Sequence, residues 1–82
     1  MTKVPRADLA RIRAIVKEIH TVNVEAYAEA VKEKFKYDKR SREYGLAVLN
    51  EKYAREKMEK SARASGDLLC AEKSLDDLGV LK

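Results

Sequence analysis

The apolar positions of the chain recur at the spacing of helices, with no alternating runs typical of strands. Between residues 5 and 20, the large aliphatic side chains fall within an arc of roughly 120° when successive residues are placed 100° apart. Arg13 and Lys17 line one edge of that arc. Pro5 suits the first turn, because its missing N–H would have no helical partner there. The pattern predicts an amphipathic helix over about 5–20, with Leu9, Ile12, Ile15, Val16 and Ile19 on its apolar face.

A polar break at 20–23 precedes the second predicted helix. Asn23 is a good N-cap, since its side-chain oxygen can accept from an N–H of the first turn. Glu25 follows in that turn, where a carboxylate favours the helix dipole. We therefore expect a helix over about 24–36, whose apolar face carries Val24, Tyr27, Ala28, Val31 and Phe35.

A second break is predicted at 37–41. The third predicted helix, the longest, follows from about 39 or 42 to 64, and Asp38 or Ser41 could cap its start. Its first half is apolar on two sides. Such a helix lies either at the centre of its bundle or against another chain, and both remain open. One side carries Leu46, Leu49 and Tyr53; the roughly opposite side carries Tyr44, Ala47, Val48, Ala54, Met58 and Ala62.

A third break is predicted at 65–67, with Gly66 as a C-terminal cap and Asp67 opening a last helix over about 67–78. The expected fold is all-α: a small bundle of three to four helices with a long third helix, forming a single domain over residues 1–82. Apolar residues make up 45% of the chain and charged residues 39%. So high a charged fraction favours an elongated molecule with much surface per residue.

Cysteine usage and hydropathy indicate where such a chain would work. Cys70 is the only cysteine, so no internal disulfide can form, and a reducing compartment such as the cytoplasm is expected. No apolar run approaches the roughly 20 residues that span a bilayer. Residues 1–5 lack the apolar stretch of a signal peptide. We expect a cytoplasmic protein that does not enter a membrane.

Catalytic and metal-binding side chains are scarce. His20 is the only histidine, and a nucleophile with its base and orienting group needs three positioned side chains. One histidine and one cysteine cannot complete a zinc site within one chain. The glycines are scattered, so there is no phosphate-binding loop. The sequence therefore predicts a protein that is not an enzyme and that holds no cofactor or metal.

Nucleic-acid binding is one of two functions that the sequence leaves open. Basic residues concentrate over 32–42, although the net charge of the chain is only +4. Lysine and arginine there could contact phosphates, helped by the edge of the first helix. The alternative is a solvated connection between helices. The candidate contacts are Arg13, Lys17, Lys32, Lys36, Lys39, Arg40 and Arg42.

Protein binding is the function that the sequence favours. A chain this short buries a thin core, and pairing is a common way to complete one. The two-sided start of the third helix points to an interface there. We expect a regulator, inhibitor or accessory subunit that forms a homodimer or binds another protein, with Leu46, Leu49, Tyr53 and Met58 as anchors.

Overall fold

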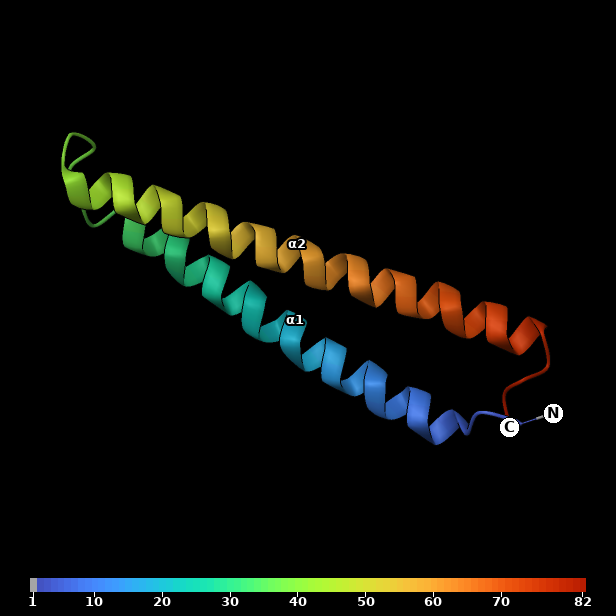
Figure 1. The fold of residues 1–82 in the computed structure, drawn as a ribbon. Coiled ribbons are helices and arrows are strands. Elements are labelled where there is room, and N and C mark those ends of the chain that lie inside the picture. The colour runs from blue at the N-terminus through green and yellow to red at the C-terminus, as the bar shows by residue number, and fades with distance from the viewer. Residues whose placement is uncertain (1) are drawn as a thin grey trace.

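The protein is a hairpin of two long antiparallel helices, as the computed structural model shows for residues 2–82 (Figure 1). Helix α1 runs over Arg6–Lys34 and helix α2 over Arg42–Asp77. The hairpin is 62 Å long and only 16 Å by 13 Å in cross-section. The all-α prediction is confirmed, but the prediction of three to four helices with a long third helix is wrong.

Helix α1 passes without interruption through the predicted break at 20–23, because the polar side chains there find partners within helical geometry. Thr21 Oγ1 donates to the carbonyl of Lys17, one turn earlier, at 3.0 Å. Asn23 does not cap a helix; its Nδ2 donates to the Lys57 carbonyl on α2 at 3.2 Å. Residues that favour caps and turns in isolation are thus held in the helix by local and tertiary hydrogen bonds.

Helix α2 likewise continues through the predicted break at 65–67. Gly66 lies in the helix interior with an ordinary negative φ, so it is not the C-terminal cap that the sequence suggested. A glycine inside a helix costs about 1 kcal/mol relative to alanine, which long flanking helical segments can offset. The first and second predicted helices therefore merge into α1, and the third and fourth into α2.

The turn at 35–41 is the one predicted break that the structure retains between helices. Ser41 is the N-cap of α2, and its Oγ accepts from the backbone N–H of Tyr44 at 3.1 Å. Asp38 stabilises the turn itself, because its Oδ1 accepts from the Arg40 N–H at 2.9 Å. The two candidate caps therefore have separate roles, and Ser41 is the one that starts the helix.

The C-terminal end of α2 folds back toward the N-terminus. Gly79 has φ +71°, and the Val80 N–H donates to the Leu75 carbonyl at 3.2 Å, as in a Schellman cap. The following residues pair with the start of the chain: the Val4 N–H donates to the Val80 carbonyl, and the Lys82 N–H to the Val4 carbonyl. This short parallel bridge fastens the end of the hairpin that lies opposite the turn (Figure 1).

The two helices meet along a heptad seam, with alternating spacings of three and four residues, the pattern of a coiled coil. The less exposed positions of both helices follow this spacing; Arg13 also takes a place in the series, although its side chain is 54% exposed. On α1 the seam comprises Leu9, Arg13, Val16, His20, Asn23, Tyr27, Ala30 and Lys34; on α2 it comprises Tyr44, Ala47, Glu51, Ala54, Met58, Ser61, Ser65, Leu68, Glu72 and Leu75.

Polar side chains occupy much of this seam. Arg13 pairs with Glu72 at 2.5 Å, and Lys34 pairs with Glu51 at 2.8 Å, three heptads away on both helices. Between these ion pairs, His20 Nδ1 lies 2.7 Å from Ser61 Oγ. Only Ala30 and Ala47 are buried hydrophobic residues, and no large side chain of residues 2–82 is fully buried. The hairpin is therefore held by polar pairs and by partly covered apolar contacts, and several bulky aliphatic side chains lie outside the seam.

Candidate interaction surface

A stripe of large aliphatic side chains runs along α1 beside the seam. Ile12, Ile15, Ile19 and Val22 follow one another at spacings of three, four and three residues, and they are 47%, 54%, 50% and 57% exposed. This is itself a heptad pattern, displaced around the helix from the seam. We call these four residues the α1 stripe. The single apolar face predicted for residues 5–20 is thus divided: Leu9 and Val16 face α2, and the α1 stripe faces away from the seam.

Helix α2 contributes apolar side chains to the same flank of the hairpin. Ala26, which continues the spacing of the α1 stripe, lines a cavity of about 140 Å³ together with Tyr53 of α2. Two helical turns further toward the hairpin turn, Glu33 and Tyr37 line a cavity of about 260 Å³ with Leu46. The α1 stripe and the pair Leu46 and Tyr53 therefore lie on one side of the molecule and extend along most of its length.

Three of the four predicted interface anchors lie on open surface. Leu46, Leu49 and Tyr53 are 58%, 44% and 54% exposed near the start of α2. Met58 lies on the seam with α1 and is partly covered there. The structure thus places Met58 apart from the other three, on the side of α2 that the hairpin itself uses.

The accessible surface of the whole molecule is large for the size of the chain. The accessible surface of the molecule is 6557 Å². A compact monomer of 9.3 kDa is expected to expose about 5,000 Å². The elongated hairpin therefore exposes about 1,600 Å² more than a compact chain would, and monomeric proteins rarely leave large contiguous apolar patches open.

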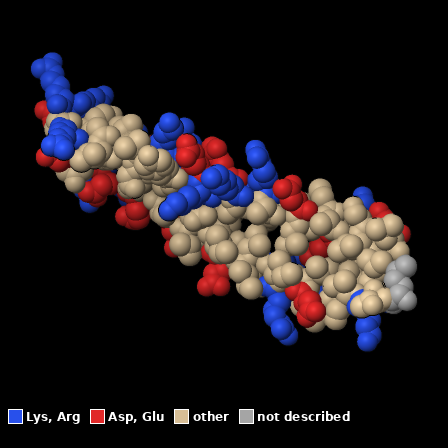
Figure 2. Space-filling model, in the orientation of Figure 1, with Lys and Arg blue, Asp and Glu red and all other residues tan. Residues whose placement is uncertain are grey.

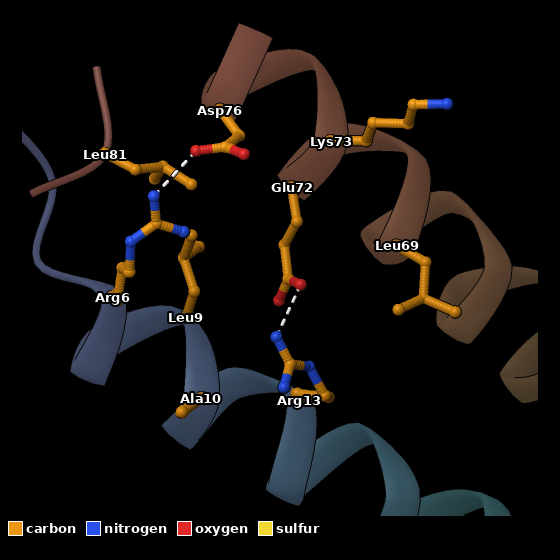
Figure 3. A pocket seen from close by; sticks show the side chains of 9 residues that line it. All are labelled: Arg6, Leu9, Ala10, Arg13, Leu69, Glu72, Lys73, Asp76 and Leu81. Atoms are coloured by element: carbon orange, nitrogen blue, oxygen red, sulfur yellow. Dashed lines mark hydrogen bonds and ion pairs between the residues drawn. The ribbon is translucent and has the colours of Figure 1, made fainter. Parts of the chain in front are cut away.

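A third hollow lies between the helices near the chain ends (Figure 3). Its volume is about 530 Å³, and Leu9, Leu69 and Leu81 form its apolar walls. Arg6 pairs with Asp76 across it, and Arg13 with Glu72. The other Glu72 oxygen, Oε1, is buried and accepts no hydrogen bond from the described residues. Four of the five charged side chains that line the hollow neutralise one another, so the hollow offers a ligand little net charge.

The basic residues predicted to contact nucleic acid do not form one surface. Arg13 is held in the seam by Glu72, and Lys17 lies on the middle part of α1. More than about 20 Å separates Lys17 from Lys32 along the helix, at 1.5 Å per residue. Lys32 and Lys36 pair with Glu29 and Glu33 at 3.9 and 2.9 Å.

What remains is a basic tip at the hairpin turn. Within residues 2–82, Lys39, Arg40 and Arg42 take part in no ion pair, and all three are exposed. Figure 2 shows basic side chains projecting from this end of the molecule. The face drawn in Figure 2 is largely uncharged in the half of the molecule near the chain ends.

Charges are neutralised locally beside this tip. Glu33 accepts hydrogen bonds from Lys36 Nζ at 2.9 Å and Tyr37 Oη at 2.8 Å. The bond from Lys36 and then that from Tyr37 lower the pKa of Glu33, and the same contacts raise the pKa values of Lys36 and Tyr37. The start of the turn is therefore a local network that leaves Lys36 less available to an external anion.

The only histidine and a buried serine form a structural pair. Ser61 Oγ lies 2.9 Å from the Met58 carbonyl, to which it can donate, and 2.7 Å from His20 Nδ1. When the hydroxyl donates to the carbonyl, Oγ accepts from the Nδ1–H tautomer of His20. A serine nucleophile needs the opposite direction, with its hydroxyl donating to the histidine.

Across residues 2–82 there is no group of three or more histidine, cysteine or acidic side chains placed to hold a metal ion. Neither helix is long and apolar enough to cross a bilayer.

Sequence reasoning missed the α1 stripe as a surface, because Ile12, Ile15, Ile19 and Val22 were expected to be core or helix-end residues. The signal that could have found it is the seam series itself, which runs at heptad spacing from Leu9 through polar residues to Lys34. Because that series faces α2, the neighbouring heptad series of aliphatic residues is left outside the seam.

Comparison of the chain with protein-family models, with curated proteins and with solved structures gives no match.

Proposed function

We propose that the chain is a small helical protein-interaction module that acts as a regulator, inhibitor or accessory subunit. It binds by packing the exposed apolar flank of the hairpin against helices of a partner. One observation carries the proposal: four bulky aliphatic side chains of α1 lie exposed in heptad order outside the seam, whereas polar pairs occupy part of the seam itself. Ordered aliphatic residues at this spacing are the geometry that a facing helix requires.

The remaining features are in keeping with a binding role. Leu46, Leu49 and Tyr53 extend the flank toward the turn, and large apolar and aromatic side chains supply most of the energy of interfaces. His20 and Ser61 are engaged with each other and give no catalytic arrangement. Cys70 is a free, exposed thiol, which suits the reducing cytoplasm, and we propose that the module works there.

Site-specific photocrosslinking in cells tests this function. A photoreactive phenylalanine replaces Ile15 or Leu46 on the apolar flank, and Glu56 on the exposed charged side of α2 serves as the matched control. We expect a protein adduct of defined mass from at least one apolar position and none from Glu56. Adducts that form equally at all three positions, or at none, would contradict the proposal.

Nucleic-acid binding by the basic tip is the second candidate function. Lys39, Arg40 and Arg42 are exposed, adjacent and without acidic partners in the described chain, which is the observation that favours it. Phosphate contacts would give an affinity that falls steeply with salt, with a log–log slope near the number of contacts. Binding that is absent at low salt, or that persists in a variant with all three residues changed to Gln, would remove this candidate.

A further inference from the structure

We propose that a second copy of this chain occupies the α1 stripe, with the two α1 helices antiparallel and Ile15 of both copies on the two-fold axis. This inference rests on the proposed function, because it names the partner of the same apolar flank. Two-fold symmetry is the commonest arrangement of soluble oligomers. Three observations support it: the area left exposed, the charges beside the stripe, and the small residues of α2 that lie next to it.

The exposed area matches what a dimer of this kind needs. Each chain exposes about 1,600 Å² more than a compact monomer of its mass would. A standard specific interface buries about 800 Å² on each partner. One interface of ordinary size therefore fits within the excess on each chain.

The charges along the free edge of the α1 stripe are self-complementary. Arg11, Glu18 and Glu25 follow one another at heptad spacing on the side of the stripe away from α2, and none of them forms an ion pair within the described chain. In an antiparallel pair centred on Ile15, Arg11 of each copy lies opposite Glu18 of the other. The contact thus gains two opposite-charge pairs.

The competing arrangements lack this match. Shifting the axis by one turn to Ile19 brings the two Glu18 side chains against each other at the centre, which is repulsive. A parallel pair would set the charged edge of one helix against the uncharged edge of the other, which carries Leu9, Val16 and Asn23, and would form no charge pairs. Charge therefore selects the antiparallel arrangement centred on Ile15.

Helix α2 leaves room for the second copy. Ala64 and Ala71 stand at the same heptad position as Asn50 and Lys57, which line the cavity next to Ala26 on this flank. The register set by Arg13 with Glu72 and by His20 with Ser61 places Ala64 about level with Ile19 and Ala71 about level with Ile12 along the hairpin. Small side chains there allow another helix to approach closely. The dimer is then a four-helix bundle over about half the length of each hairpin. The two turns, with Leu46 and Tyr53, project from it in opposite directions.

Engineered cysteines test the arrangement. In a Cys70→Ser background, Ile15→Cys places two thiols on the proposed axis, where their Cα atoms can reach the 4.4–6.8 Å that a disulfide requires. We expect Ile15→Cys to form a covalent dimer under mild oxidation and Ile19→Cys, equally exposed on the same stripe, to form little. Rapid linkage through Ile19→Cys with none through Ile15→Cys would overturn the proposed axis.

Charge reversal provides an independent test in the unmodified background. By sedimentation at micromolar concentration we expect a dimer, weakened about tenfold by Arg11→Glu and by Glu18→Arg and restored in the double variant. Circular dichroism controls for folding, because neither side chain has an ion pair inside the described chain.

The two proposals fail differently. A strict monomer whose Ile15 photocrosslinks to a different protein overturns the second copy and leaves the interaction module intact. A monomer with no specific adduct at Ile15 or Leu46 overturns both.

Discussion

Replacing Gly66 with alanine separates a continuous α2 from a helix that ends at the glycine. Gly66 lies inside Arg42–Asp77 with a negative φ, and nothing lies within 4 Å of the position that an added Cβ would take. The methyl group therefore enters open space on the exposed side of the helix. Alanine restricts the unfolded chain more than glycine does and causes no clash in the folded one.

The expected gain is about 1 kcal/mol, the difference between glycine and alanine in a helix interior. In a domain of 60–100 residues, 1 kcal/mol moves the melting temperature by about 4–8 °C. A helix that ended at Gly66 would instead hold the glycine in the left-handed region, where alanine costs roughly 1–2 kcal/mol. A continuous α2 therefore predicts that Gly66→Ala raises the melting temperature, and a helix that ends at Gly66 predicts that it lowers it.

The assay is thermal unfolding followed by circular dichroism at one fixed protein concentration, since self-association would add to the apparent stability. Gly79→Ala is the matched control: its φ of +71° is the left-handed value, so this variant should melt several degrees below the parent chain. If Gly66→Ala also lowers the melting temperature, the continuous α2 is refuted.

Two further predictions concern the helix start and the polar seam. Ser41→Ala should cost about 1 kcal/mol by removing the N-cap of α2, whereas Ser74→Ala, exposed within the helix, should change the melting temperature little; equal effects would contradict the cap. The hydrogen bond from Lys34 to Glu51 raises the pKa of Lys34 above its ordinary 10.5. Stability from this contact should be complete below pH 10.5 and lost as the pH rises through the higher folded value, so the melting temperature should fall more steeply there than in Glu51→Gln. If the melting temperatures of the parent chain and of Glu51→Gln fall in parallel with pH, the contact adds nothing to stability.

The helical class and the central turn could be predicted from the sequence because they depend on local signals. Ser41 is a cap by virtue of its own side chain and the next backbone amides, and the 3.6-residue period is visible in the residues themselves. The breaks at 20–23 and 65–67 were wrong because Asn23 and Gly66 were judged by local preference alone. Asn23 binds the Lys57 carbonyl on the other helix, and such a contact is not visible in a single segment.

The assignment of faces failed for a related reason. Apolar arcs were taken as the inside of the fold, yet the seam selects positions such as Arg13, His20 and Lys34 on α1 and leaves Ile12, Ile15 and Ile19 outside. Polar residues can form the inside of a hairpin only when their partners on the second helix match them in charge and position. That match depends on the pairing of α1 with α2, which periodicity along one helix does not reveal.

The charged pairs of the seam also fix the register of α1 against α2, and therefore the length of the hairpin. If α1 slid along α2 by one heptad, Lys34 would leave Glu51 and meet either Tyr44 or Met58, and Glu51 would remain a covered charge without compensation. Sliding in either direction is therefore disfavoured, although the apolar contacts alone would tolerate it. The turn and the chain ends are therefore held at opposite ends of a hairpin 62 Å long, at a separation that the seam keeps fixed.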